Sequence, residues 1–379
     1  MTQRKRVLFL INSLVGGGAE RVMCTLLRHS EAEREEFDIT LGLIDVEQAG
    51  NKAPDWVNVR QLDGRMSLTR SVLEVRKLFA EVRPDVCLSF LRRANFANVI
   101  NAGSRSIISE RANASAQFGS NARGAVSRAM IRALYPRAHK VISVSDGVSD
   151  DLRVHFGLPP EKLITIPNPV DVDVIRARAA EPAPIDIGEP YIMAAGRLVP
   201  SKGFDVLIRA YAAAKVKEKL VIAGVGELRD QLIALAHECG VGDRVVLPGY
   251  FENPYPLMRG AELVVLSSSI EGFPNALVEA MALGRPTIAT NSASGPSEIL
   301  AEAPRESITD LTFAAHGVLT PVGSVERMAE ALSAMADPER RRHYSERGPL
   351  RVEAYSAKAA KDRYWAVIRD ALQSAPQRR

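Results

Sequence analysis

The sequence predicts an α/β protein built from two doubly wound domains, each with a parallel sheet. Three observations support this prediction. The chain has 379 residues, more than one domain usually contains. Short apolar runs alternate with helix-like segments along its length, as in βαβ units. This alternation is interrupted once, by the stretch "RAAEPAPIDIGEP", and then begins again. We therefore expect domains at 1–170 and 171–357, with a helix at 358–379 that packs back on the first.

The first series of elements opens with an apolar strand at 6–12. A glycine-rich loop follows, and then a helix at 19–30 whose apolar residues recur at helical spacing. Further strands of this domain are expected at 38–43, 86–90, 106–109, 140–144 and 163–166.

The second series repeats the pattern. Its strands are expected at 191–195, 219–223, 244–247, 263–266, 287–289 and 317–319. A last helix is expected at 356–372, because Tyr364, Val367, Ile368 and Leu372 form one apolar stripe.

The composition is that of an ordinary globular protein, with 46% hydrophobic and 25% charged residues. Its three cysteines are isolated and offer neither a disulfide framework nor zinc spacing, so we expect a reducing cytosol. The apolar run at 7–11 is too short for a signal peptide, and no segment has the roughly 18 apolar residues of a membrane span. The net charge of +4 mildly favours anionic partners.

The stretch "SIEGFPNALVEAMALGRP" contains two unusual carboxylates. A helix is expected at 275–283, and it is apolar almost all round, which is typical of a buried helix. Glu279 nevertheless lies in its middle, and Glu271 precedes it by eight residues. A buried carboxylate is costly unless it is neutralised or hydrogen-bonded. Either a salt bridge or the hydroxyl groups of a ligand, such as a ribose diol, would satisfy it.

Two loops between a strand and a helix are suited to phosphate groups. "GGGAER" contains Gly17 and Gly18, which would let a ligand approach the positive end of the following helix. It is not the GxGxxG dinucleotide fingerprint, and a plain turn is the alternative. "AAGRLVPSKGFDVLI" brings Arg197 and Lys202 to one loop, where two cations suit a diphosphate. Two solvated surface charges are the alternative.

Three weaker patterns are interpreted as structural. "IAGVGELRDQL" is another glycine turn after a strand. Asp171 and Asp173 resemble a metal-binding DxD triplet, but we interpret them as part of the domain hinge. The six histidines show neither metal-ligand nor catalytic spacing.

Taken together, these motifs resemble the family 4 retaining glycosyltransferases, which have the GT-B fold. The ordered set that carries the resemblance runs over nearly the whole chain: "GGGAER", "SVSDGVSDDL", "IPNPVD", "GRLVPSKGFDVLI", "AGVGEL", "SSSIEGFPNALVEAMALGRPTIAT" and "SGPSEIL". The resemblance implies two Rossmann-like domains that face each other across a cleft, with an acceptor-binding N-terminal domain and a donor-binding C-terminal domain. It also implies sugar transfer from a nucleotide sugar with retention of configuration and without a metal or other cofactor.

The resemblance further assigns roles to residues of this chain. Glu279 would hold the ribose and Glu271 the hydroxyls of the donor sugar. Arg197 and Lys202 would grip the diphosphate. Backbone groups near Phe273, Pro274 and Asn275 would assist, and Gly17 and Gly18 would lie beneath the donor phosphates.

One departure concerns the first domain. Many relatives have a histidine there, near the reacting carbon, whereas this chain has "ISERANAS". Glu110 and Arg111 stand at that place, and either could take over the catalytic role.

Within the family, the chain resembles enzymes that extend polyprenyl-diphosphate-linked saccharides, in "SFL…AN", in "IISE" and in a basic helix that follows. The stretch 121–140 has no acidic residue, and its helix carries Arg123, Arg128 and Arg132. These arginines would contact the anionic membrane surface and the diphosphate of the acceptor. A solvated helix face is the alternative.

The sequence therefore predicts a retaining, metal-independent glycosyltransferase of bacterial cell-surface glycan synthesis. It would move a hexose or N-acetylhexosamine, from a UDP-sugar rather than a GDP-sugar, to a lipid-linked saccharide at the cytoplasmic face of the membrane. A lipopolysaccharide-core, capsule or other acceptor is one alternative, and a nucleotide-sugar epimerase is another. A nucleic-acid binder, suggested by the basic charge, is disfavoured because no nucleic-acid-binding motif is present.

Overall fold

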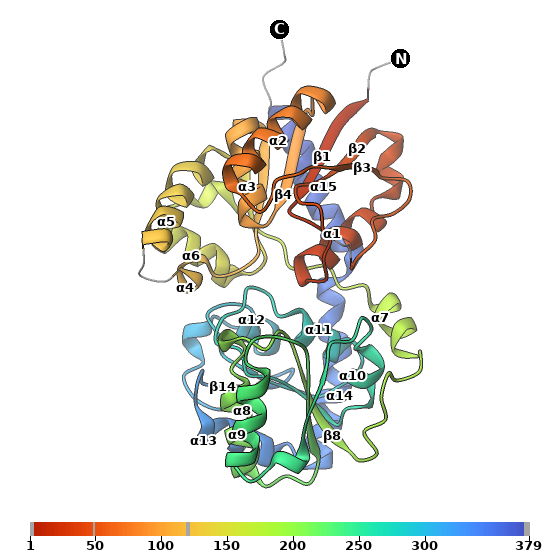
Figure 1. Ribbon diagram of the computed structural model, residues 1–379, viewed down its shortest axis with the longest axis vertical. Helices are drawn as coiled ribbons and strands as arrows, with labels where there is room; N and C mark the ends of the chain where they lie inside the picture. The colour runs from red at the N-terminus through yellow and green to blue at the C-terminus, as the bar shows by residue number, and fades with distance from the viewer. Residues whose placement is uncertain (1–3, 48–49, 119–121, 375–379) are drawn as a thin grey trace. The chain divides into compact units, whose positions relative to one another are not determined.

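The computed structural model describes residues 4–47, 50–118 and 122–374. The chain divides into two compact units. Unit 1 comprises Met1–Pro169 and Ala357–Arg379, and unit 2 comprises Val170–Ser356. Each unit has its own seven-stranded sheet with helices on both faces (Figure 1).

The sheet of unit 1 is entirely parallel and has the order β3-β2-β1-β4-β5-β6-β7. The chain starts in the middle of this sheet, builds one half outward and then returns to build the other, which is the doubly wound pattern. The strands are β1 (Lys5–Ile11), β2 (Phe37–Leu43), β3 (Asn58–Gln61), β4 (Val86–Phe90), β5 (Ser106–Glu110), β6 (Lys140–Ser143) and β7 (Leu163–Thr165).

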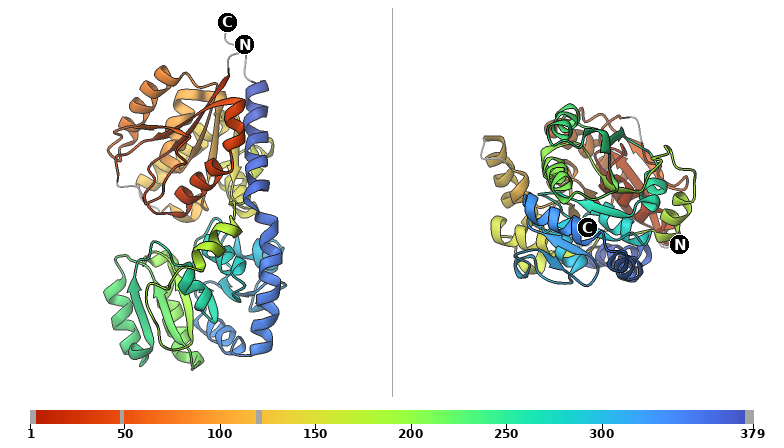
Figure 2. Two further views of the ribbon diagram at one scale, coloured as in Figure 1. Left: turned by 90° about the vertical axis from the view of Figure 1, so that its right-hand side faces the viewer. Right: turned by 90° about the horizontal axis from the view of Figure 1, so that it is seen from below.

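The C-terminal helix α15 (Ala357–Ser374) is part of the core of unit 1. It lies beside α1 in the side view (Figure 2). Trp365 of α15 is fully buried and stacks on Phe37 of β2, with their ring centroids 4.9 Å apart. The other helices of this unit are α1 (Gly18–Arg28), α2 (Leu68–Val82), α3 (Arg92–Ala102), α4 (Ala114–Gln117), α5 (Ala122–Leu134) and α6 (Asp146–Phe156).

The sheet of unit 2 has the order β10-β9-β8-β11-β12-β14-β13. Its strands are β8 (Tyr191–Ala195), β9 (Lys219–Ala223), β10 (Val245–Gly249), β11 (Leu263–Leu266), β12 (Thr287–Thr290), β13 (Thr312–Phe313) and β14 (Val318–Thr320). Its helices are α7 (Val172–Ala179), α8 (Phe204–Ala214), α9 (Arg229–Glu238), α10 (Tyr255–Gly260), α11 (Asn275–Ala282), α12 (Pro296–Leu300), α13 (Val325–Ala334) and α14 (Pro338–Val352).

The predicted class, two doubly wound α/β sheets, is confirmed. Two strands were not predicted. All four residues of β3 are exposed at the edge of the first sheet, and β13 contributes two residues antiparallel to β14 at the edge of the second. Neither strand has the apolar run by which the other strands were predicted.

A buried ion pair ties together three segments of unit 1. Nη1 of Arg93, in the first turn of α3, donates to Oδ1 of Asp45 at 2.9 Å, and the Asp45 side chain is only 3% exposed. Asp45 also accepts a hydrogen bond from the backbone N–H of Met66. Burial alone would raise the pKa of Asp45, but the bonds from Arg93 and Met66 lower it below its usual value.

In the part of the chain that the structure describes, no helix has both the length and the apolar composition needed to cross a membrane.

Candidate active site

The candidate residues lie where parallel strands end. Gly17 and Gly18 follow β1, and Glu110 is the last residue of β5. In unit 2, Arg197 follows β8 and Glu271 follows β11. The carboxyl ends of parallel strands share one edge of a sheet, and open α/β sheets bind their ligands at that edge.

Two predicted residues of unit 2 are in direct contact. Nζ of Lys202 lies 2.6 Å from Oε1 of Glu271. Their side chains are 24% and 12% exposed, so the pair is largely withdrawn from solvent but still accessible. The residues were predicted to bind different parts of one ligand, and the structure brings them together as an ion pair.

The Lys202 loop depends on a glycine. Gly203, which caps α8, has a φ of +60°, and a β-carbon there would lie 2.3 Å from the carbonyl oxygen of Ser267. Only glycine allows this approach. The hydroxyl of Ser267 also donates to the carbonyl of Lys202 at 2.8 Å. The Lys202 loop is therefore fixed against the segment that leads to Glu271.

Arg197 is exposed and lies on the loop that follows β8. The loop that follows β9 packs against it. The backbone N–H of Leu198 donates to the carbonyl of Val225 at 2.9 Å. A β-carbon on Gly224 would lie 1.8 Å from the carbonyl oxygen of Gly196. The glycines of "AGVGEL" thus allow two loops to pack backbone to backbone, as expected for a structural turn, and they hold the Arg197 loop in place.

Glu279 lies within α11, and Pro274 is the N-cap residue of this helix. The helix is largely buried, and Glu279 itself is only 8% exposed. The buried helix with an internal carboxylate is therefore as predicted. Before it, Phe273 is buried and contacts Tyr355 edge to face at 5.2 Å, while Asn275 is partly buried.

A neighbouring loop fixes the turn from Glu271 to Pro274. The hydroxyl of Ser294 donates to the carbonyl of Glu271 at 2.8 Å. Gly295 has a φ of +97°, and a β-carbon there would lie 2.7 Å from Cδ of Pro274. The "SGPSEIL" motif thus supports the Glu271 turn.

In unit 1, Gly17 caps α1 and Gly18 is its first residue. Glu20 of the same "GGGAER" motif was not among the predicted residues. Burial raises the pKa of Glu20, and the positive charges of Arg111 and Arg21 partly oppose this. An acidic group with a raised pKa near a strand end is a functional candidate.

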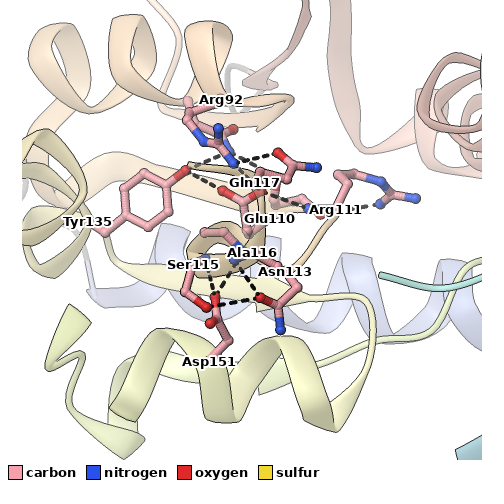
Figure 3. Close-up of polar contacts among 12 residues, drawn as sticks. Arg92, Glu110, Arg111, Asn113, Ser115, Ala116, Gln117, Tyr135 and Asp151 are labelled. Atoms are coloured by element: carbon pink, nitrogen blue, oxygen red, sulfur yellow. Dashed lines mark hydrogen bonds and ion pairs between the residues drawn. The ribbon is translucent and has the colours of Figure 1, made fainter. Parts of the chain in front are cut away.

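Glu110 is held from two sides (Figure 3). The hydroxyl of Tyr135 donates to its Oε2 at 2.6 Å, and Nη2 of Arg92 lies 3.6 Å from its Oε1. Burial, followed by the negative charge of Glu110, raises the pKa of Tyr135 well above its usual value. Tyr135 therefore keeps its proton and remains the donor. Glu110 itself is 4% exposed.

Arg111 is bound to the body of unit 1. Its guanidinium donates to Asn168, to the hydroxyl of Ser109 and to the hydroxyl of Tyr364. It also lies over the ring of Phe90, 4.4 Å from the centroid. Glu110 and Arg111, the two candidates for the role of the histidine found in many relatives, are thus both held by residues of the surrounding structure.

Arg92 was also overlooked, although it belongs to the quoted "SFL…AN" stretch. It opens α3 directly after Leu91, which has the strained φ of +73°. Its guanidinium stacks on Phe118 at 4.3 Å and donates to Gln117 at 3.0 Å. Strained backbone at a strand end is common at functional sites. The run of two arginines after a strand could have indicated it from the sequence.

The basic helix predicted within 121–140 is α5, and Asn121 lies outside the described residues. Arg123 is exposed. Arg128 donates to the carbonyl of Phe118 at 3.5 Å, and Arg132 to the carbonyl of His155 at 2.9 Å. The last two arginines therefore also contact the backbone of their own unit.

The DxD-like pair has a structural explanation. The side chain of Asp171 caps α7 by accepting the backbone N–H of Val174 at 3.3 Å, and Asp173 lies in the first turn of that helix. Across residues 4–47, 50–118 and 122–374, no group of three histidine, cysteine, aspartate or glutamate side chains is arranged to hold a metal ion.

Two family models match consecutive parts of the chain. The Glycosyltransferase Family 4 model matches residues 16–174, and the model named Glycosyl transferases group 1 matches residues 176–351. The chain is a family 4 glycosyltransferase. The family prediction from the motifs is thereby confirmed, and with it the prediction of a glycosyltransferase.

Relatives of known name agree with this assignment. The N-acetylgalactosamine-N,N'-diacetylbacillosaminyl-diphospho-undecaprenol 4-alpha-N-acetylgalactosaminyltransferase of Campylobacter jejuni is 30% identical over 369 residues, covering 93% of this chain and 96% of that protein. The lipopolysaccharide core biosynthesis glycosyltransferase LpsE of Rhizobium meliloti is 33% identical over 199 residues, covering 52% of this glycosyltransferase and 54% of LpsE.

Solved structures show that the glycosyltransferase has the GT-B fold. A sucrose-phosphate synthase from Thermosynechococcus elongatus superposes with a TM-score of 0.80 at 18% identity, covering 98% of this chain and all of that one. Anabaena HepE in complex with UDP and glucose superposes with a TM-score of 0.75 at 17% identity, covering 97% and 100% of the two chains.

Proposed function

We propose that this glycosyltransferase moves a hexose or N-acetylhexosamine from a UDP-sugar to a saccharide carried on a polyprenyl diphosphate. The observation that carries the proposal is the near-full-length similarity to the Campylobacter jejuni enzyme, whose name specifies a diphospho-undecaprenol acceptor. The uracil base is proposed from the family resemblance.

The ion pair of Lys202 and Glu271 supports a donor site in unit 2. When the bond between sugar and diphosphate breaks, negative charge grows on the leaving diphosphate. Fixed cations such as Lys202 and Arg197 then stabilise the transition state more than the ground state. Glu271, held by Lys202 at 2.6 Å, would accept hydrogen bonds from hydroxyls of the sugar, and Glu279 from the ribose.

We further propose that transfer retains the anomeric configuration and needs no divalent metal. Arg197 and Lys202 would supply the positive charge that a metal provides in other transferases. Attack from the same face as the leaving group is favoured, with a donor phosphate oxygen as the base. In this mechanism the carboxylates bind and orient the donor rather than form a covalent intermediate.

The proposed place of action is the cytoplasmic face of the membrane, to which the protein would bind peripherally. Exposed Arg123 on α5 and the nearby arginines Arg128 and Arg132 would contact anionic lipid headgroups and the acceptor diphosphate. Each basic residue near an anionic bilayer contributes about 1 kcal/mol.

The test is a transfer assay with radiolabelled UDP-sugars and GDP-mannose, with and without a polyprenyl-diphosphate-linked oligosaccharide. Label should enter the lipid extract from one UDP-sugar, only with the acceptor, and in the presence of EDTA. NMR of the product should show the anomer of the donor. Label found only in a new nucleotide sugar would indicate an epimerase, and transfer only to lipopolysaccharide core or capsule fragments would refute the polyprenyl acceptor.

A further inference from the structure

A cavity of about 540 Å³ lies at the amino-terminal ends of β1, β2 and β3 in unit 1. This volume is within the range of small-molecule sites. Because the sheet is parallel, the cavity is at the edge opposite to the one that carries Gly17, Gly18 and Glu110. The transfer chemistry proposed above therefore does not account for it.

The strand register explains why the cavity is polar. Arg6 is level with Asp38, and Thr40 is level with Asn58. Side chains that are level in neighbouring parallel strands, or two apart in one strand, project from the same face. Arg60 follows Asn58 by two residues, so three strands contribute polar side chains to one face where a sheet normally presents a core.

Four arginines line this cavity: Arg4, Arg6, Arg34 and Arg60. Two carboxylates in the lining, Asp38 and Glu81, reduce the formal charge from +4 to +2. The residues that line the cavity come from segments that are far apart in the sequence. They belong to β1, β2 and β3, to the segments just before these strands, and to the end of α2.

Each of the four arginines has a partner among the described residues, and three of these partners are carboxylates. Arg60 lies 3.2 Å from Glu81, and Arg34 lies 3.3 Å from Glu31. Nε of Arg6 is buried and makes no hydrogen bond within the described parts of the chain, but it lies 3.8 Å from Oδ2 of Asp85. Nη1 of Arg4 donates to the carbonyl of Arg34 at 3.2 Å. A guanidinium has five N–H donors in a planar fork that matches phosphate oxygens. One carboxylate partner leaves donors for a second anion.

The other residues that line the cavity indicate what kind of molecule would carry the anionic group. Trp56 is partly buried, packs against the core and lines the cavity, so its ring can contact a ligand. Asp38, Thr40 and Asn58 can bond to hydroxyl groups. We propose that this cavity binds a phosphate or diphosphate group attached to a hydroxylated small molecule, at a site separate from the transfer site.

The two tryptophans of the chain provide a local signal. Trp365 is fully buried, and its Nε1 donates to the hydroxyl of Ser30 at 2.7 Å, so a ligand in the cavity should alter mainly the emission of Trp56. The probes are inorganic pyrophosphate, a hexose 1-phosphate and phosphatidylglycerol vesicles. The first two represent a soluble ligand and the vesicles a lipid headgroup. We expect a saturable emission change with at least one soluble probe, and its absence in Trp56→Phe.

The decisive variant is Arg34→Gln with Arg60→Gln, because both side chains are exposed and their loss should not impair folding. We expect the affinity for pyrophosphate to fall roughly tenfold or more. Arg70→Gln with Arg76→Gln, which removes two exposed charges from α2, should leave it unchanged.

Lys202→Ala should also keep the emission change, because that residue belongs to unit 2. Loss of the signal in Lys202→Ala would assign it to the transfer site and overturn the proposal. So would equal binding by the Arg34 and Arg60 variant, an unchanged signal in Trp56→Phe, or no response to either soluble probe. A response to vesicles alone would replace the soluble ligand by a lipid headgroup and equally overturn the proposal as stated.

Discussion

The two units share the arrangement of their first five strands but hold their candidate residues differently. In both sheets the chain starts at a central strand, winds outward and returns, and the candidate side chains follow the carboxyl ends of strands. In unit 2, Lys202 and Glu271 are partners of each other. In unit 1, Glu110 is bound by Tyr135, and Arg111 by Asn168 and Tyr364.

This difference indicates how each site can respond to a ligand. A diphosphate can compete for Lys202, since the ion pair is partly exposed and both members are candidates for the same ligand. The partners of Glu110 and Arg111 belong to the surrounding structure, so these groups are fixed in place. We therefore expect substitutions in unit 2 to affect catalysis first and substitutions in unit 1 to affect stability first.

The largest effect on stability is expected for Arg93→Ala in unit 1. Removing one partner of a buried ion pair costs about 3–5 kcal/mol, because the other charge is left buried and unpaired. Urea denaturation should show this loss in the free energy of unfolding, whereas Arg70→Ala, at an exposed position of α2, should change it little. A loss of less than about 1 kcal/mol in Arg93→Ala would contradict the role of the pair.

The same pair predicts a pH dependence. The pKa of Asp45 is lowered in the folded protein, so its stabilisation is present above the usual carboxyl pKa of about 4 and is lost as the pH falls through the lowered value. The difference in the free energy of unfolding between wild type and Asp45→Asn should therefore become smaller as the pH falls below about 4.

In unit 2, Lys202→Ala should reduce kcat by roughly 10²–10³-fold, the cost of removing one donor that stabilises transition-state charge. Its effect on UDP affinity should be smaller, and Arg197→Ala should show the same bias. Lys215→Ala, on the same unit, is the control. Kinetics with saturating donor and calorimetry with UDP separate the two quantities. If UDP affinity falls and kcat is unchanged, Lys202 binds the ground state only.

Glu279→Ala should weaken UDP binding by roughly 10- to 150-fold, the value of one charge-assisted hydrogen bond. Glu271→Ala should leave UDP affinity nearly unchanged and reduce turnover, since its proposed partner is the sugar. Calorimetry of both variants with UDP and GDP measures this contrast. Equal UDP affinity in a folded Glu279→Ala protein would refute the ribose assignment.

The sequence predicted the fold of both units, and it singled out the candidate residues of unit 2, because there the physical signals are local. Buried parallel strands are continuous apolar runs, and Glu279 is conspicuous as a charge within an apolar helix. Even so, the contact between Lys202 and Glu271 joins residues 69 apart, so only the fold could reveal it.

The surroundings of the candidate residues in unit 1 were less predictable from the sequence, because they depend on contacts between residues that are far apart in the chain. Tyr135 and Asn168 look like ordinary residues in the sequence, and only tertiary packing places them on Glu110 and Arg111. The strand β3 was missed because its residues are exposed at a sheet edge. The raised pKa of Glu20 depends on burial, which a glycine-rich loop does not indicate.

A smaller effect is expected for Arg128→Ala combined with Arg132→Ala. Two basic residues at about 1 kcal/mol each give a roughly 30-fold loss of binding to anionic vesicles, with UDP affinity unchanged. Because both side chains donate to backbone carbonyls, Arg128→Lys with Arg132→Lys is the matched control that keeps the charge. Vesicle sedimentation measures the difference. Unchanged binding and unchanged use of the lipid acceptor would make this a solvated helix face.

The smallest effect is expected for Glu20→Gln, and its sign tests the comparison between the units. The pKa of Glu20 is raised in the folded state, so the wild type loses stability as the pH rises from the usual glutamate value through the raised one. Glutamine does not titrate, and the variant should therefore melt slightly higher than wild type at neutral pH and equally at about pH 4. Thermal melts across this range measure it. If turnover falls while the melting temperature rises, Glu20 destabilises the folded protein but supports its activity. A residue with both effects is typical of active sites. If turnover is unchanged, the strand ends of unit 1 serve mainly to position other groups, as Glu110 and Arg111 suggest.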